Sequence, residues 1–267
     1  MTRLAWCYGV ARVLLVCGMC LAPVMANAQT VWVGRFQVPS AQPSSSAPVQ
    51  LPAPWRVVPI SKLKPTAYRS LLWDGVPAIQ ARADSSMALL AREVQVDLAQ
   101  TPVLCWRWRV ENLISQADMF KKSGDDYPAR VYVAFSLPAS SMSLAVRAKL
   151  KLARAIYGDL VPDGAINYVW DKDNPVGTLQ PNAYTDRTHM KVQRSGGLQL
   201  GQWVMERVNV WEDAQRAFGP LSTQDLRLNV LAVASDTDNT GETAVAGFAD
   251  LHFVPAQAAC EFTSLQP

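Results

Sequence analysis

The sequence predicts one mainly antiparallel β-sandwich with a single inserted amphipathic helix. From residue 55 onward, apolar and polar residues alternate in short runs, and turn-forming residues separate these runs. Runs of this kind are typical of a sandwich or a barrel, and their number here favours a sandwich. One longer run has the period of a helix instead.

The chain begins with the pattern of an export signal. Arg3 and Arg12 give residues 1–28 a charged start, an apolar run follows at 13–25, and the segment ends in Ala-Asn-Ala. Small residues at these positions suit a signal peptidase, so we expect cleavage after Ala28 and a periplasmic or secreted protein. The apolar run is shorter than the roughly 20 residues that span a bilayer, and no transmembrane segment is expected after cleavage.

The composition of the remaining chain fits a globular domain. We expect a lead-in at 29–54 and a sandwich domain at 55–267. Two of the cations behind the net charge of +3 lie in the signal, so the mature chain is close to neutral. That balance excludes a nucleic-acid-binding protein with a basic stripe, and it does not indicate an oligomeric state.

Two cysteines remain after the signal is removed. Cys7, Cys17 and Cys20 lie inside it, which leaves Cys105 and Cys260. In an oxidising compartment these two could form a disulfide or could remain separate thiols, and sequence alone does not supply the geometry that decides.

The predicted elements follow from local periodicity. A short alternating segment at 31–38 precedes a Pro- and Ser-rich stretch that reads as an extended lead-in. Alternation then predicts strands at 68–73, 78–83, 87–96, 103–110, 130–137, 165–170, 189–192, 203–209, 226–234 and 244–254.

The clearest strand is the segment at 103–110. Leu104, Trp106, Trp108 and Val110 share one face of it, so that face is expected to be buried. The segment at 130–137 alternates in the same manner. We therefore expect these two strands to pair, with their arginines on a common polar surface.

The helix is predicted at 143–157, and it ends at Gly158, a favoured stop. Its apolar stripe consists of Leu144, Ala145, Ala148, Leu152, Ala155 and Ile156, and the cations opposite are Arg147, Lys151 and Arg154, with Lys149 beside them. On a folded domain such cations usually form a solvated face; the alternative is a helix that lies on an acidic membrane surface. A second short helical turn is predicted at 212–218.

Several blocks resemble the bacterial domain-of-unknown-function 3047 family. They are Pro52-Ala53-Pro54-Trp55, Leu104-Cys105-Trp106-Arg107-Trp108-Arg109-Val110, Gly124-Asp125-Asp126-Tyr127-Pro128, Gly201-Gln202-Trp203, Glu206-Arg207-Val208-Asn209 and Ser235-Asp236-Thr237-Asp238-Asn239. The resemblance covers nearly the whole mature chain, and it implies an exported bacterial protein without an assigned activity. More loosely, the Leu-x-Trp-x-Trp-x-Val strand resembles those of jelly-roll carbohydrate-binding modules, which implies a jelly-roll fold and glycan binding.

Charged residues on the predicted strands suggest a ligand surface. Arginine and carboxylate arrays recognise polar or anionic ligands through paired hydrogen bonds, although a structural ion-pair network is the commoner use of such residues. Trp170 could add a stacking platform for a sugar ring. The candidate ligand-binding residues are Arg107, Arg109, Asp125, Asp126, Arg130, Trp170, Glu206, Arg207 and Asn209.

Two further readings use the acidic residues. Glu206 and Asp126 could act as the acid and base of a glycoside hydrolase if they lie about 5–10 Å apart. Asp236, Asp238 and Asn239 offer alternating oxygens on a turn, which suits calcium or a simple turn cap. No other cofactor is predicted.

The sequence therefore predicts non-catalytic binding of a glycan or another envelope component. The alternatives are a carbohydrate-active hydrolase and a structural partner of an envelope protein. Nucleophilic catalysis is disfavoured, since the chain has two histidines and no Gly-x-Ser-x-Gly motif.

Overall fold

The computed structural model describes residues 29–37, 51–60, 62–157, 161–222 and 226–264. The predicted export signal and most of the Pro- and Ser-rich stretch lie outside these residues.

The regular structure of the described chain consists mainly of strands, with two α-helices. In order along the chain, its elements are β1 (Val31–Gly34), β2 (Arg56–Pro59), β3 (Ala67–Trp73), β4 (Val76–Asp84), β5 (Ala88–Val96), β6 (Val103–Val110), β7 (Arg130–Ser136), α1 (Leu144–Tyr157), β8 (Gly164–Asp171), β9 (Leu179–Asn182), β10 (Thr185–Ser195), β11 (Val204–Asn209), α2 (Val210–Phe218), β12 (Arg227–Ala234) and β13 (Thr243–Val254). Two short 3-10 turns, Lys122–Gly124 and Ala139–Ser141, complete the set.

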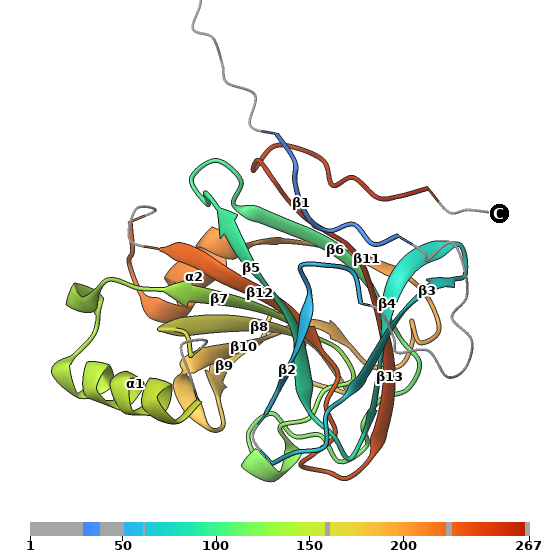
Figure 1. The fold of residues 1–267 in the computed structure, drawn as a ribbon, viewed down its shortest axis with the longest axis horizontal. Helices are drawn as coiled ribbons and strands as arrows, with labels where there is room; N and C mark the ends of the chain where they lie inside the picture. The colour runs from blue at the N-terminus through green and yellow to red at the C-terminus, as the bar shows by residue number, and fades with distance from the viewer. Residues whose placement is uncertain (1–28, 38–50, 61, 158–160, 223–225, 265–267) are drawn as a thin grey trace, which may run out of the picture.

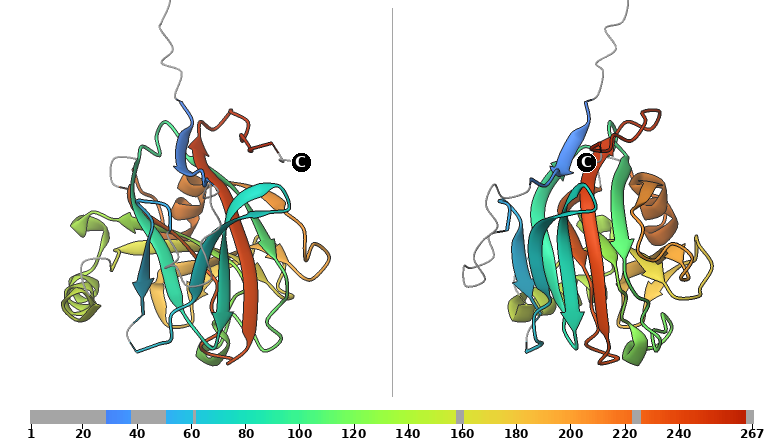
Figure 2. Two further views of the ribbon diagram at one scale, coloured as in Figure 1. Left: turned by 45° about the vertical axis from the view of Figure 1, so that its right-hand side comes forward. Right: turned by 90° about the vertical axis from the view of Figure 1, so that its right-hand side faces the viewer.

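The strands form two facing sheets (Figures 1 and 2). Sheet A has the order β11-β6-β13-β4-β3, with β1 paired to β13, and sheet B has the order β2-β5-β12-β7-β8-β10-β9. All described strand pairs are antiparallel except β8 with β10.

The winding of the chain makes this sandwich a jelly roll. Strand β4 pairs with β13, β5 with β12, β6 with β11 and β7 with β8. Successive pairs alternate between sheet A and sheet B. A ribbon of antiparallel pairs wound alternately through two sheets is the arrangement of a jelly roll, so the predicted fold class is confirmed.

All ten predicted strands are present, and their boundaries differ by a few residues at most ends. The structure adds β2 and β9, and β1 coincides with the alternating segment of the lead-in. Both added strands are four residues long and contain a proline, which weakens the local signal for a strand.

The predicted pairing between the strands at 103–110 and 130–137 is wrong. β6 lies in sheet A between β11 and β13, whereas β7 lies in sheet B between β12 and β8. The two strands contribute their apolar faces to one core from opposite sheets, so their polar faces look in opposite directions. Arg107 and Arg130 therefore lie on opposite outer faces of the sandwich.

The core between the sheets contains the predicted aromatic face of β6. Trp106 and Trp108 are fully buried there, and each has a ring neighbour from β8 in the opposite sheet. Trp106 packs against Tyr168 and Trp108 against Trp170, with ring centroids 5.6 and 5.7 Å apart. These large rings supply much of the apolar area that holds the two sheets together.

A disulfide joins Cys105 to Cys260. It fastens the segment that follows β13 against the outer face of sheet A, where Cys105 packs with Val103, Val254 and Phe262. This contact explains why the outward-facing residues of β6 are buried even though they do not face the core.

The two helices differ in how they meet the sandwich. α2 follows β11 directly, and Asn209 caps it by accepting a hydrogen bond from the Glu212 N–H. α1 lies at the periphery of the molecule, as Figure 1 shows at the left. No helix among the described residues is long and apolar enough to cross a membrane.

Candidate functional site

The predicted ligand residues do not gather on one surface. The two sheets carry them in three separate places: the outer face of sheet A, the inner edge near β10 and β11, and one end of sheet B.

On the outer face of sheet A, the arginines of β6 are engaged in ion pairs. Arg107 is buried, pairs with Asp250, and donates to the Thr263 carbonyl in the segment after β13. Arg109 pairs with Asp74 and Glu111 and lies over the Trp73 ring, 4.9 Å from its centroid. Both guanidinium groups therefore fix loops and chain ends to the sheet.

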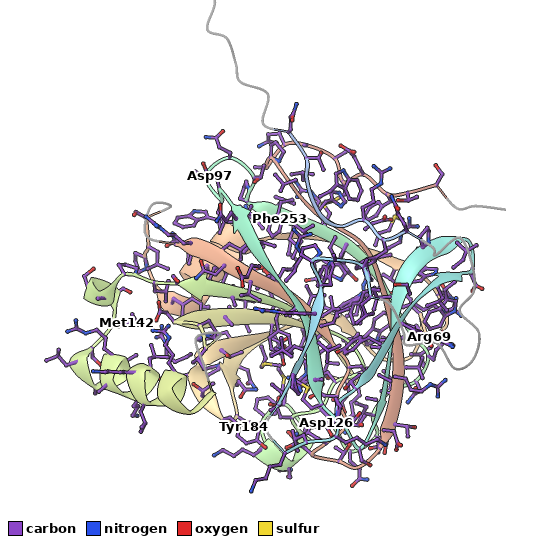
Figure 3. All side chains as sticks on the ribbon, viewed as in Figure 1. Arg69, Asp97, Asp126, Met142, Tyr184 and Phe253 are labelled. Atoms are coloured by element: carbon purple, nitrogen blue, oxygen red, sulfur yellow. A yellow bond between two sulfur atoms is a disulfide. The ribbon has the colours of Figure 1, made fainter. Side chains whose placement is uncertain are left out.

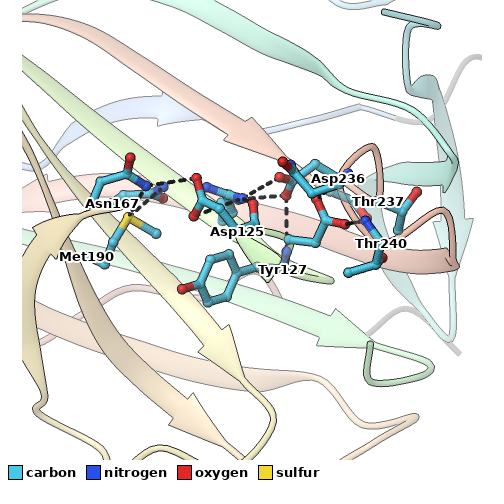
Figure 4. Close-up of polar contacts among 12 residues, drawn as sticks. Asp125, Tyr127, Asn167, Met190, Asp236, Thr237 and Thr240 are labelled. Atoms are coloured by element: carbon cyan, nitrogen blue, oxygen red, sulfur yellow. Dashed lines mark hydrogen bonds and ion pairs between the residues drawn. The ribbon is translucent and has the colours of Figure 1, made fainter. Parts of the chain in front are cut away.

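At one end of sheet B, Arg130 lies in an acidic cluster that consists of Asp125, Asp126, Asp236 and Asp238. Its Nε donates to Asp236 Oδ1 at 2.6 Å, and its Nη2 donates to Asp236 Oδ2 and to the Asp125 carbonyl. Figure 4 shows this end of sheet B with Asp125 and Asp236 labelled, and Figure 3 places Asp126 and Tyr184 at this end of the sandwich, away from Asp97. Asp125, Asp126 and Arg130 lie together at this end of the sheet, and the loop with Asp236 joins them.

The carboxylates of the acidic cluster outnumber its cations. Burial raises the pKa of Asp236 well above its ordinary value, the neighbouring Asp126 raises it further, and Arg130 opposes the shift. Burial and the Asp126 charge also raise the pKa of Asp238, which is partly exposed. The cluster is thus an incompletely neutralised buried array.

The acidic cluster is also the place of the predicted calcium site. Oxygens of Asp126, Asp236 and Asp238 all lie within 4.8 Å of one another, close enough to surround a cation. However, Asp236 is occupied by Arg130, and Asp126 accepts hydrogen bonds from Asn239 and from the Thr240 N–H.

The third predicted ligand, Asn239, is also engaged, because its Oδ1 accepts from the Tyr184 hydroxyl at 2.6 Å. Calcium would have to displace Arg130 from Asp236 and sit beside a guanidinium group. The donor set therefore fits an ion-pair network better than a calcium site.

The third place is the inner edge of the sandwich, where Glu206 is buried. Its carboxylate accepts from Trp108 Nε1 at 3.0 Å, from Gln193 and from Arg194. Asp126 lies in the acidic cluster at the end of sheet B, and no hydrogen bond or ion pair joins it to Glu206 among the described residues. The structure thus places the two carboxylates in different clusters, each with hydrogen-bond partners of its own.

The remaining predicted residues have structural contacts as well. Trp170 is buried in the core, so it is not an exposed stacking platform. Asn209 caps α2, and the exposed Arg207 donates to the Ala256 carbonyl.

The outer face of sheet B holds a groove that the sequence did not reveal. It has a volume of about 640 Å³, within the range of small-molecule sites. Strands β5, β12 and β7 form its floor, and the end of α1 with the segment before β8 forms its wall. Its lining residues are Glu93, Val94, Gln95, Ala134, Ser136, Arg154, Val161, Pro162, Asp163, Asn229 and Val230.

The polar groups of this sheet-B groove include both hydrogen-bond donors and hydrogen-bond acceptors. Gln95 and Asn229 offer amides, and Ser136 offers a hydroxyl that accepts from Asn229 Nδ2. Gln95 is exposed, and its side chain makes no hydrogen bond within the described ranges. These residues occupy the polar positions of their strands, and that alternation is the only signal of them in the sequence.

Comparisons with known proteins give a family and distant structural likenesses. The model of the family described as "Protein of unknown function (DUF3047)" matches residues 53–252. No curated protein matches the chain significantly.

The chain is similar in structure to the family 11 carbohydrate-binding module of a cellulosomal cellulase of Clostridium thermocellum, with a TM-score of 0.37 and 6% identity over 78% of this chain and 91% of that chain. It is also similar to a family 12 xyloglucanase from Bacillus licheniformis, with a TM-score of 0.34 and 10% identity over 74% of this chain and 78% of that chain. At these scores the likenesses carry no argument about binding or activity.

Proposed function

Because the chain belongs to the DUF3047 family, a family of proteins of unknown function, we propose its function from the geometry of the site. The protein binds a hydroxyl-rich glycan, without catalysis, in the sheet-B groove. The observation that carries the proposal is the line of Glu93, Gln95, Asn229 and Ser136 across three neighbouring strands.

Sugar hydroxyls both donate and accept hydrogen bonds, so they suit a surface with both kinds of partner. Amides supply a donor and an acceptor on each side chain, and the carboxylate of Glu93 supplies acceptors. Because Glu93 and Gln95 are exposed, a ligand that replaces water there does not need to break a buried contact.

The carboxylates of the groove favour binding over hydrolysis. Asp163 accepts from the Leu137 N–H and from Arg154 Nη2, at 3.0 and 2.8 Å. Glu93 pairs with Arg56 on the edge strand β2. A hydrolase needs one carboxyl free to donate a proton and a second one free to act on the sugar. Of the two groove carboxylates, Glu93 has only an exposed ion pair, whereas Asp163 is held by two donors, so one member of such a pair is not free.

We also propose that the protein acts outside the cytoplasm. The predicted signal at 1–28 supports export, and so does the disulfide between Cys105 and Cys260, because disulfides persist in oxidising compartments. An exported protein with a hydroxyl-binding groove would meet envelope glycans.

Titration calorimetry tests the proposal with residues 29–267, which hold every described element. Soluble polysaccharides and cell-wall fragments are screened for a saturable signal. The Gln95→Ala/Asn229→Ala variant should bind the selected glycan about 10- to 30-fold more weakly, because two hydrogen bonds of about 1 kcal/mol each are lost.

The matched control is Gln116→Ala/Gln202→Ala, which removes two exposed amides outside the groove. The control should bind like the unmodified protein. If the groove variant binds as tightly as the unmodified protein, the proposed site is contradicted. If reducing sugar is released, the protein is a hydrolase and the proposal of binding without catalysis is wrong.

A further inference from the structure

The outward face of α1 has an apolar stripe that nothing in the described structure covers. Leu144 and Leu152 are 75% and 64% exposed, and Ala145 and Ala148 on the same side are exposed too. Sequence periodicity gives this stripe, but on a globular domain the apolar side of a helix normally faces the core. Here the expected orientation is reversed.

A different side of α1 holds it to the sandwich. Leu150 is buried, and Arg154 donates to the Val161 carbonyl and to Asp163 at 2.9 and 2.8 Å. The helix starts after Ser143, whose Oγ accepts from the Val146 N–H at 3.2 Å. These contacts set the rotation of the helix about its axis, so the stripe points away from the body.

Cations flank the exposed stripe on both sides. With 100° between successive residues, the stripe occupies an arc from Leu144 to Ala145, with Arg147 and Lys151 before it and Lys149 after it. All three cations are exposed, and none of the ion pairs of the described structure involves them. The sequence of α1 contains no acidic residue.

We propose that α1 docks this protein on an anionic lipid bilayer. A helix with an apolar stripe between two rows of cations can place its leucines at the boundary between headgroups and acyl chains while the cations meet lipid phosphates. With 14 residues, α1 is shorter than the roughly 20 that span a bilayer, which agrees with a position in the plane of the surface.

Charge complementarity selects this occupant over an apolar protein partner. A purely apolar partner would leave three cations at the rim without counter-charges, whereas an anionic bilayer offers a phosphate to each of them. The wall of the sheet-B groove includes Arg154 and Asp163, so a docked protein would hold the groove beside the bilayer.

Vesicle co-sedimentation tests the proposal with residues 29–267. The protein should sediment with vesicles of phosphatidylcholine and phosphatidylglycerol at a 3:1 ratio, and it should stay in solution with pure phosphatidylcholine. Salt at 0.5 M should weaken the binding, because it screens the attraction between the cations and the lipid.

Two variants separate the contributions of the helix. Lys149→Gln/Lys151→Gln should bind the anionic vesicles about 30-fold more weakly, and Leu144→Gln/Leu152→Gln should lose at least about 10-fold. The controls are Lys62→Gln/Arg227→Gln, which removes two exposed cations elsewhere, and Leu198→Gln, which changes a leucine that is 96% exposed. Both controls should bind like the unmodified protein.

Because the substituted side chains are exposed, circular dichroism and the melting temperature should not change in any variant. Absence of binding to the anionic vesicles would overturn the proposal, and so would equal binding by the helix variants and their controls. The vesicles contain no glycan, so this result is independent of the test of the groove.

Discussion

Arg130 is the residue whose removal should most disturb the acidic cluster. Arg130 is 2% exposed, and its guanidinium donates two hydrogen bonds to the Asp236 carboxylate, while Asp126 and Asp125 lie close by. Substitution Arg130→Met retains the approximate volume and leaves Asp236 buried without its partner. Loss of one member of a buried pair costs about 3–5 kcal/mol of the free energy of unfolding.

The pH dependence of this loss follows from the carboxyl pKa values. Burial already raises the pKa of Asp236, and removal of Arg130 should raise it further above the ~3.9 of an unfolded aspartate. A carboxyl with a raised folded-state pKa favours folding in its protonated form. The deficit of Arg130→Met should therefore be largest at neutral pH and should shrink as the pH falls toward 4.

Urea unfolding of both proteins between pH 4 and pH 8 measures this difference. Arg227→Met, an exposed arginine on β12, is the control and should change the free energy of unfolding by less than about 0.5 kcal/mol. If Arg130→Met does not fold, Arg130→Lys keeps the charge and should lose about 1–2 kcal/mol with the same pH trend. A loss below about 1 kcal/mol for Arg130→Met, or one independent of pH, would refute the reasoning.

Three other substitutions test separate parts of the structure. Cys260→Ser should lower the free energy of unfolding by about 3–5 kcal/mol in urea titrations, because the disulfide closes a separation of 155 residues. If the urea midpoint of the unmodified protein does not change when a reductant is added, this prediction is contradicted. Glu206→Gln should cost about 1–3 kcal/mol, because it weakens buried contacts with Trp108 and Arg194, and glycan binding should persist; loss of a measurable hydrolase activity would point to a catalytic role instead. Asp238→Asn should raise stability at neutral pH by no more than about 0.5 kcal/mol and should have no effect below pH 4, since folding raises the pKa of this partly exposed carboxyl. The melting temperature of the unmodified protein should not change on addition of millimolar calcium. An increase that Asp238→Asn abolishes would instead support calcium binding at the acidic cluster.

The strands and their buried faces could be predicted because they depend on local periodicity. Leu104, Trp106 and Trp108 face the core as alternation requires. The assignment of strands to sheets could not be predicted in the same way, because pairing is a long-range property. β6 is followed along the chain by β7, yet the two belong to different sheets.

The same limit explains why the predicted ligand surface is divided. Arg107 pairs with Asp250, 143 positions away, and Arg130 pairs with Asp236, 106 positions away. A sequence shows that these charges exist, but it does not show that each has a buried partner. The sheet-B groove likewise combines residues from three strands that are far apart along the chain.

The orientation of α1 was open for a related reason. Its helical period and its apolar stripe could be recognised from Leu144 and Leu152. Which side meets the sandwich depends on Leu150 and on the contact between Arg154 and Asp163, which only the folded chain establishes.

The proposed function depends on binding of a glycan in the sheet-B groove. The most direct test is to record backbone amide NMR spectra of residues 29–267 during titration with the glycan selected by calorimetry. We expect the largest shifts at Glu93, Gln95 and Asn229, on the neighbouring strands β5 and β12. Shifts centred on Arg107 and Arg109 at the outer face of sheet A, or the absence of any localised shift, would contradict the claim.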